Sequence, residues 1–173
     1  MRKLTFLILF FSCSYQVYAF QADSSQVDET ILLFVRHAER AEDGTRNPPI
    51  SEIGIERAEN LAQVLIEANY KLTAIYSTPY KRTQMTSQPT ADLFELEVIE
   101  YGFDDLENWL STIIETNKGN AVLIVGHSNT TPRLVNMVLG EESFEQLDEH
   151  AYGDLFIVST KSYGTGNVGV SSF

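Results

Sequence analysis

Two runs of apolar residues, each followed by a histidine, constrain the fold of this chain more than any other feature. The run Ile31–Val35 holds five apolar residues, and Arg36 and His37 follow it directly. The run Ala121–Val125 repeats this design and is followed, after one glycine, by His127. Continuous apolar runs of this length are typical of strands buried on both faces of a parallel sheet. Ligands of such sheets bind beyond the carboxyl ends of the strands, so both histidines are predicted to lie at one such edge.

Segments with helical periodicity alternate with further strand-like segments. Ser51 can cap a helix, and an apolar stripe at helical spacing follows it: Ala58, Leu61, Ala62, Leu65 and Ala68. A second stripe, expected to stop near Gly119, consists of Leu106, Trp109, Leu110, Ile113 and Ile114. Further strands are expected over 72–76, 97–101, 155–159 and 168–172, the last two as an edge hairpin. This alternation predicts an α/β fold with a mostly parallel sheet covered on both faces.

Prolines and polar residues predict where several elements begin and end. Pro79 suits the first position of a helix that would include Arg82, and Pro89 is expected to kink or end that helix. Thr130 or Thr131 can cap another helix, which would close at Gly140. The segment 39–49 is predicted to form a loop over the ligand edge, and 141–149 a loop or one short helix.

The amino terminus has the pattern of an export signal. A basic start and a short apolar run precede Val17-Tyr18-Ala19, so we expect residues 1–19 to be a signal peptide. Residues 20–173 would then form a single domain in the periplasm or outside the cell. A retained apolar anchor and a lipoprotein attached to the membrane through Cys13 are the alternatives.

Composition excludes several classes of partner and cofactor. The formal net charge is −12, which argues against nucleic acid and anionic membranes as partners. Cys13 is the one cysteine. Its loss with the signal peptide would leave no thiol for disulfides, nucleophilic catalysis or metal binding. We therefore expect no metal and no other cofactor.

Two arginines and two histidines are expected to meet at the predicted edge. Arg36 and His37 are neighbours and would point apart on an extended strand, but a turn at His37 would let both face one pocket. Arg82 adds a guanidinium whose planar fork matches phosphate oxygens, and His127 comes from the other strand. A neutral imidazole is a competent nucleophile toward phosphorus, with cations stabilising the charged oxygens. Each residue alone is also typical of ordinary surface or turn positions, so the argument depends on their order along the chain.

The motifs that carry these residues resemble those of the histidine phosphatase superfamily, also called phosphoglycerate-mutase-like. Arg36–Glu39 resembles its first motif, and Thr78–Thr86 its middle signature, (Ser/Thr)-x-x-x-Arg-x-x-x-Thr. Gly126–Thr130 reads Gly-His-Ser-Asn-Thr, as in a small bacterial subgroup, and Ile50–Gly54 is similar to the family's Leu-Thr-x-x-Gly. The resemblance extends from about Ile31 to Ser159. It implies a three-layer α/β/α sandwich.

The resemblance also implies a role for each residue. His37 would be the nucleophile that forms a phosphohistidine, while Arg36, Arg82 and His127 would bind the phosphoryl group. Larger members of the family carry a general acid on an insertion between the second arginine and the second histidine, for which this chain has little room. Carboxylates that could serve instead are Glu39, Glu100, Asp104 and Asp105.

These observations lead to the expectation of a metal-independent phosphatase that hydrolyses a phosphomonoester. A mutase is disfavoured because it needs an enclosing cap to retain its intermediate. Two alternatives stay open: a phosphatase acting on phosphohistidine or another phosphoprotein, and a non-catalytic phosphate-binding module. The expected partner is a small phosphorylated substrate or a phosphoprotein, and the oligomeric state is not predicted.

Overall fold

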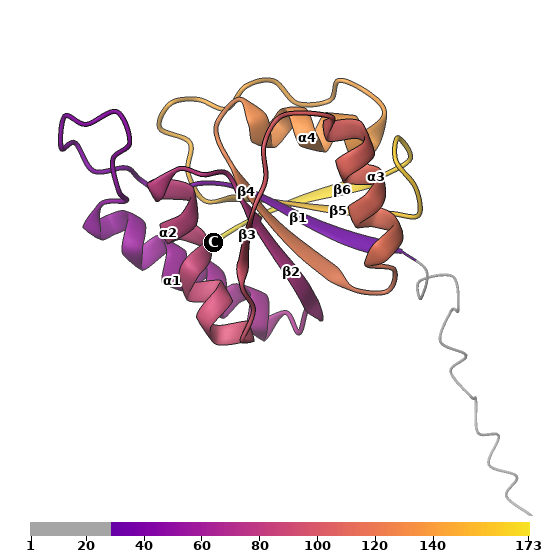
Figure 1. Ribbon diagram of the computed structural model, residues 1–173, viewed down its shortest axis with the longest axis horizontal. Helices are drawn as coiled ribbons and strands as arrows, with labels where there is room; N and C mark the ends of the chain where they lie inside the picture. Colours follow the sequence, from indigo (N-terminus) through magenta and orange to yellow (C-terminus); the bar gives the residue numbers. More distant parts are fainter. Residues whose placement is uncertain (1–28) are drawn as a thin grey trace, which may run out of the picture.

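The two apolar runs form adjacent strands at the centre of the molecule. A computed structural model describes residues 29–173. Strand β1 (Thr30–Arg36) pairs in parallel with β4 (Ala121–Gly126), in a register that places Arg36 opposite Gly126 (Figure 1). Every residue of β4 is buried, as are all residues of β1 except the partly buried Ile31. The prediction of two strands buried on both faces is confirmed.

The remaining strands extend this central pair in both directions. The order in the six-stranded sheet is β3-β2-β4-β1-β5-β6. Strands β2 (Leu72–Ser77) and β3 (Val98–Glu100) are parallel to β4, whereas β5 (Asp154–Thr160) and β6 (Asn167–Ser172) form an antiparallel hairpin beside β1. The sheet is therefore mostly parallel with an edge hairpin, as predicted.

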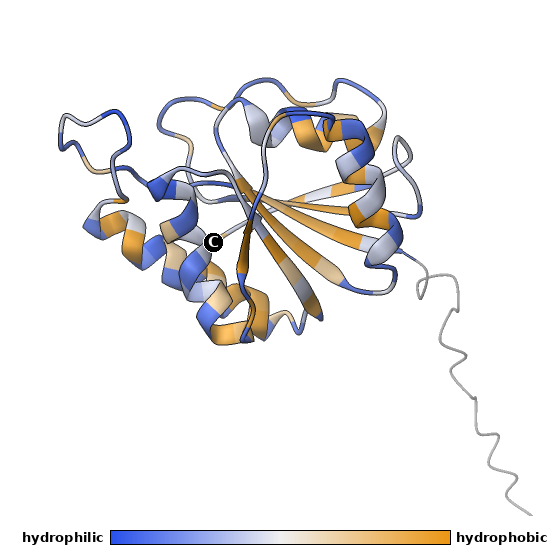
Figure 2. Cartoon of the chain, in the orientation of Figure 1, coloured by the Kyte–Doolittle hydropathy of each residue, from blue (hydrophilic) through white to orange (hydrophobic). Residues whose placement is uncertain are grey.

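Helices cover both faces of the sheet. Helices α1 (Glu52–Glu67) and α2 (Lys81–Phe94) lie on one face, and α3 (Leu106–Thr116) and α4 (Thr130–Leu139) on the other (Figure 1). Alternate residues of each central strand pack into different hydrophobic cores, because successive side chains of a strand point to opposite faces of the sheet. Phe34 packs in the core under α3 and α4, and its neighbour Leu33 in the core under α1 and α2. The apolar strands between polar outer helix faces are visible in Figure 2. The three-layer α/β/α architecture is confirmed.

Two helices begin differently from the prediction. Helix α2 begins at Lys81 with Tyr80 as its N-cap, so Pro79 lies before the helix and not at its first position. Helix α4 has Asn129 at its N-cap, and Thr130 and Thr131 are its first residues. Their hydroxyls bond to the strand ends instead of capping: Thr130 Oγ1 accepts from His127 N at 2.9 Å, and Thr131 Oγ1 donates to Val35 O at 3.1 Å.

Pro89 does not end α2, which continues to Phe94. An internal proline removes one backbone hydrogen bond and costs about 3 kcal/mol. Burial of the residues around it offsets that cost: Ser87, Thr90 and Ala91 are all buried against neighbouring elements. Tertiary packing thus outweighs the local signal of the proline.

Other predicted boundaries hold with small changes. Ser51 caps α1, with its side chain accepting from Gly54 N at 3.2 Å, and Gly140 closes α4 in the left-handed region at φ 78°. The stripe on α1 is buried except for its last member, Ala68, which is exposed at the C-cap. The stripe on α3 is buried apart from the partly buried Trp109. Residues 141–149 form a loop without a helix.

The predicted signal peptide (1–19), the cleavage after Ala19 and the alternative anchor at Cys13 lie outside the described residues and stay predictions. Among residues 29–173, none of the helices is long and apolar enough to cross a membrane.

Candidate active site

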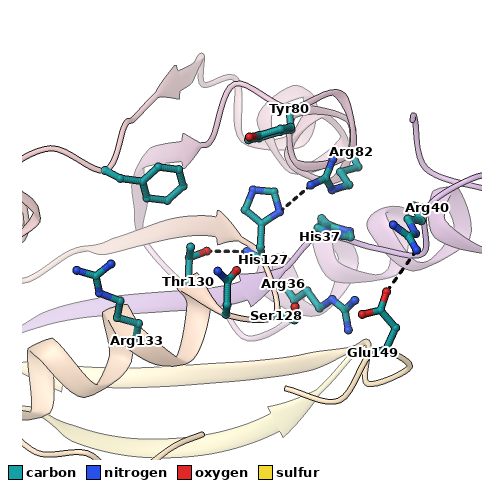
Figure 3. Close-up of a pocket in the computed structure, with 12 residues that line it drawn as sticks. Arg36, His37, Arg40, Tyr80, Arg82, His127, Ser128, Thr130, Arg133 and Glu149 are labelled. Carbon is teal, nitrogen blue, oxygen red and sulfur yellow. Dashed lines mark hydrogen bonds and ion pairs between the residues drawn. The ribbon is translucent and has the colours of Figure 1, made fainter. Parts of the chain in front are cut away.

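The four residues singled out from the sequence meet in one cavity at the carboxyl edge of the parallel strands. Arg36 ends β1, His37 follows it, His127 follows β4, and Arg82 lies in the first turn of α2. All four line a cavity of about 460 Å³ (Figure 3). The two imidazole ring centroids lie 5.4 Å apart with the rings inclined by 69°. The predicted convergence of these side chains is therefore present in the structure.

Arg36 and His37 reach the same cavity because the chain leaves the strand at His37. His37 N still donates to Gly126 O at 2.9 Å, so the ladder between β1 and β4 closes at this residue. Arg36 is held from the other side by the 148–152 segment. Its NH1 donates to Asp148 O (2.8 Å) and Ala151 O (2.9 Å), and its guanidinium lies 4.1 Å from the ring centre of Tyr152.

One hydrogen bond determines which nitrogen of His37 is free. His37 Nδ1 lies 2.7 Å from the carbonyl oxygen of Ala38. A carbonyl oxygen only accepts, so Nδ1 carries the proton and the lone pair resides on Nε2. Burial, more than the nearby cations, lowers the pKa of His37 from its ordinary 6.5 to about 3. The ring is thus neutral at physiological pH, with Nε2 as an available nucleophile.

His127 is held at both nitrogens by side chains. Its Nδ1 faces Arg82 NH2 at 3.3 Å, and its Nε2 faces Thr78 Oγ1 at 2.9 Å. A guanidinium only donates, so Nδ1 is the acceptor and Nε2–H donates to Thr78. The Thr78 hydroxyl can in turn donate a hydrogen bond to Thr83 Oγ1 (2.9 Å), whose own hydroxyl donates to the Thr78 carbonyl. Burial, followed by the positive charge of Arg82 and Arg36, lowers the pKa of His127 to about 4.

The spacing of the Thr78–Thr86 segment follows from these contacts. Thr78 orients His127, Arg82 faces the same ring, and Thr86 Oγ1 accepts from Ala38 N at 2.9 Å. Each of the three residues therefore connects β2 or α2 to one of the two histidine-bearing strand ends.

The glycine before His127 is required for a steric reason. A Cβ at Gly126 would lie 2.9 Å from the hydroxyls of Thr130 and Thr131.

The cavity is strongly cationic. Four arginines line it, namely Arg36, Arg40, Arg82 and Arg133. The guanidinium Nε of Arg36 is buried without an acceptor among the described residues. A buried donor without a partner costs about 1–3 kcal/mol, and an anionic ligand would relieve that cost. Guanidinium groups and the N-terminus of α4 together suit a tetrahedral oxyanion.

None of the four carboxylates proposed as general acids lines the cavity. Glu39 instead binds Arg57, whose NH2 lies 2.6 Å from Oε1. Burial alone would raise the pKa of Glu39, but the hydrogen bonds from Arg57, the backbone N–H of Glu39 and the charges of Arg57 and Arg36 together lower it, so this carboxyl is ionised. Glu100 accepts from Gln84 on the protein surface. Asp104 and Asp105 are exposed beside Phe103, the neighbour that does line the cavity.

Sequence reasoning missed several lining residues. Glu149 is the one carboxylate among the described residues that line the cavity, and it pairs with Arg40 at 3.3 Å. Its position depends on the 141–153 loop folding back over the site, where Leu147 N donates to Ser128 O at 2.9 Å. Tyr80 could have been found by its adjacency to Arg82, over which its ring lies at 4.6 Å. Within residues 29–173, no group of three or more histidine, cysteine, aspartate or glutamate side chains could hold a metal ion.

Comparison with known proteins agrees with this geometry. Residues 32–102 match the histidine phosphatase superfamily (branch 1). Phosphoserine phosphatase 1 of Hydrogenobacter thermophilus is 40% identical over 75 residues, which is 40% of this chain and 35% of that protein. The chain therefore matches about a third of the length of this curated relative.

Solved structures share the fold over most of the chain. The protein histidine phosphatase SixA, complexed with tungstate, superposes with a TM-score of 0.67 at 17% identity, covering 82% of this chain and 96% of SixA. Phosphoserine phosphatase from Entamoeba histolytica, in complex with 3-phosphoglyceric acid, gives a TM-score of 0.61 at 16% identity, covering 83% and 96%. Residues 32–102 are thus similar to branch 1 of the histidine phosphatase superfamily, and the chain as a whole shares its fold with these solved structures.

Proposed function

We propose that this protein is a metal-independent phosphatase that hydrolyses a phosphomonoester through a phosphohistidine on His37. The observation that carries the proposal is the hydrogen bond from His37 Nδ1 to the Ala38 carbonyl. It leaves a neutral Nε2 in a cavity lined by guanidinium groups. The relatives support the same chemistry, since one is a phosphoserine phosphatase and another is a histidine phosphatase that binds tungstate, a tetrahedral oxyanion.

In the first step, the Nε2 lone pair of His37 forms a bond to phosphorus while the bond to the ester oxygen breaks, and that oxygen leaves with the bonding electron pair and takes a proton from water. Arg36 and Arg82 stabilise the negative charge on the oxygens of the transferring group. When the ester binds as its monoanion, its P–O–H proton passes to Nδ1 of His127, which then donates a hydrogen bond back to that oxygen, while Arg82 turns from Nδ1 to a phosphoryl oxygen. In the second step, water attacks phosphorus, the N–P bond breaks and its electron pair returns to Nε2, and inorganic phosphate leaves.

Glu149 is suited to the second step. Its carboxylate pairs with Arg40 at 3.3 Å, and its oxygens can accept a hydrogen bond from the attacking water. We therefore assign it the role of orienting water, in place of the four carboxylates considered from the sequence.

None of the four carboxylates considered as general acids lines the cavity, which favours one second candidate, a phosphatase for phosphohistidine or another phosphoprotein. A leaving group that is already good needs little protonation, and the cavity mouth has the exposed aromatic rings of Tyr80 and Phe103. Both candidates pass through the same phosphohistidine.

Trapping that intermediate is the decisive experiment. The protein would be mixed with a ³²P-labelled substrate, such as acetyl phosphate, and quenched, and acid-labile, base-stable label on His37 would be sought by peptide mapping. Label on His37, together with release of inorganic phosphate, is expected. Phosphate binding by calorimetry with no label and no turnover would instead identify a non-catalytic phosphate-binding module.

A further inference from the structure

One ion pair begins two residues after His37 and takes no part in the proposed chemistry. Arg57 on α1 donates through Nε to both carboxylate oxygens of Glu39 at 2.9 Å, and its NH2 lies 2.6 Å from Oε1. Neither residue lines the cavity. Of the three ion pairs among residues 29–173, this one is the least exposed, with side-chain exposures of 26% and 21%. A guanidinium bound in this way by a carboxylate fixes the geometry of both partners.

Glu39 shares a planar peptide group with the Ala38 carbonyl, which is the acceptor of the Nδ1–H of His37. The backbone holds that peptide group on both sides. Ala38 N donates to Thr86 Oγ1 at 2.9 Å, and Glu39 O accepts from the N-cap residue of α1 at 2.7 Å. Because Arg57 binds the carboxylate of Glu39, the side chain adds a third anchor to the same peptide group.

The remaining nitrogen of Arg57 contacts a second segment of the site. Its NH1 donates to Phe173 O at 3.0 Å, and Phe173 N donates to Gly153 O at 3.0 Å. Gly153 directly follows the segment 148–152, which holds the guanidinium of Arg36. A Cβ at Gly153, where φ is 91°, would lie 2.6 Å from Arg57 NH1, so no side chain fits between them. One guanidinium thus contacts the segments on both sides of the β1 end.

We propose that Arg57 is a positioning residue, which through Glu39 holds the carbonyl that keeps the proton on Nδ1 of His37. Its second contact supports the segment that holds Arg36. Without the bond to that carbonyl, the imidazole proton is distributed over both nitrogens, and a ring protonated at Nε2 has no lone pair for phosphorus. The effect on rate rests on the proposed function, whereas the tautomer of His37 can be measured without substrate.

The imidazole ¹⁵N chemical shifts of His37 test the positioning directly. At neutral pH, a nitrogen that carries the proton and one that carries the lone pair give well-separated signals, and H37N assigns them by their loss. We expect the wild type to show the Nδ1–H form alone. E39Q and R57A should show both tautomers, and R57K, which keeps the charge but loses the planar fork, should lie between. Circular dichroism checks that each variant is folded, and E39Q keeps an amide oxygen as acceptor if R57A proves unstable.

Steady-state kinetics separates the two contacts of Arg57. R57A should lower kcat by about ten- to a hundredfold, since a misplacement of about 1 Å in a reacting group can cost a hundredfold. E39Q removes only the contact toward His37, so it should lower kcat with little change in KM. R57A also frees the segment that holds Arg36, so it alone should raise KM as well.

E115Q and K118A are the matched controls. They break the exposed ion pair between Glu115 and Lys118 (3.0 Å), which does not line the cavity, and they should leave the tautomer, kcat and KM unchanged. A single Nδ1–H tautomer in E39Q and R57A, together with wild-type kcat, would overturn the inference even if both variants are less stable, since the pair would then serve the fold alone. If no ester is hydrolysed, the proposed function fails but the tautomer still decides: a mixture in E39Q supports the positioning role, and a single form rejects it.

Discussion

The strand ends of β1 and β4 both present a buried histidine, but they hold it in opposite ways. His37 is fixed at one nitrogen by the backbone of the next residue, with 2.7 Å between Nδ1 and the Ala38 oxygen. His127 is held at both nitrogens by side chains from other elements, Thr78 on one side and Arg82 on the other. A ring that is hydrogen-bonded at one nitrogen keeps a free lone pair on the other nitrogen. A ring that is hydrogen-bonded at both nitrogens has no free lone pair and is instead fixed in orientation beside the first ring. On this contrast we propose that the β1 end attacks phosphorus and that the β4 end stabilises the anion.

The largest expected effect comes from removing the free nitrogen. H37A should abolish the covalent path, so activity should fall to background, a loss of many powers of ten for phosphomonoester hydrolysis. Acid-labile label should be absent in a quench experiment with ³²P-labelled substrate, and circular dichroism should show a folded protein. Label retained on His127 in this variant would place the nucleophile on the other strand.

Removing the doubly held ring should be less severe. H127A loses one donor to the phosphoryl group, worth roughly 2.7–4 kcal/mol by analogy with a single oxyanion-hole donor, so kcat should fall about a hundred- to a thousandfold. Some phosphoenzyme should still form, because His37 is untouched. R36A and R82A should resemble H127A, with weaker phosphate capture. Equal loss of label in H37A and H127A would remove the distinction between the two strand ends.

Acid should destabilise the fold through the buried rings. Burial is the main reason that the pKa of His37 lies at about 3 in the folded protein, against an ordinary value of 6.5. A lowered pKa means that the unfolded chain binds the proton more readily, so stability is present above pH 6.5 and is lost as the pH falls below it. Between pH 6.5 and pH 5, His37 alone should reduce the free energy of unfolding by about 1–2 kcal/mol.

Urea denaturation at the two pH values measures this loss. Most carboxylates titrate below this window, and H37N should show a correspondingly smaller change. A wild type and an H37N variant with the same pH dependence would contradict the buried neutral state.

Removing the hydrogen-bond acceptor behind His127 should reduce activity less than removing the ring itself. T78V keeps the shape of Thr78 but removes the acceptor of His127 Nε2–H, a neutral hydrogen bond worth about 0.5–1.5 kcal/mol. We expect a two- to tenfold loss of kcat and an acid limb of the pH–rate profile displaced from that of the wild type, because the orientation and basicity of His127 change. T83V removes a hydroxyl that lies one hydrogen bond further from the His127 ring, so it should reduce kcat less than T78V does. An unchanged pH profile in T78V would indicate a purely structural threonine.

Removal of divalent metal should have no effect. The electrophilic groups around both histidines are guanidinium groups, which repel metal cations, so EDTA should leave the phosphatase activity unchanged. Loss of activity in EDTA, restored by one added metal ion, would replace the proposed mechanism.

Local sequence determined the scaffold and its reactive strand ends. The run Ile31–Val35 is apolar at every position, which suits a strand covered on both faces, and a parallel pairing brings Arg36 beside Gly126 at one edge. The stripe on α3 and the cap at Ser51 follow from helical spacing and from the free amides of a helix start. These features depend on neighbours a few residues apart, so the sequence predicts them.

Tertiary structure decided the rest. Pro89 stays inside α2 because buried contacts offset a local penalty. Glu39 is withdrawn from catalysis by Arg57, 18 residues further along the chain, and Glu149 enters the cavity because the 141–153 loop folds back over the site. The positions of Glu149 and Arg133 relative to the two histidines depend on contacts between segments far apart in sequence. Periodicity and spacing carry no information on such contacts, because their energies exist only once the sheet has brought the segments together.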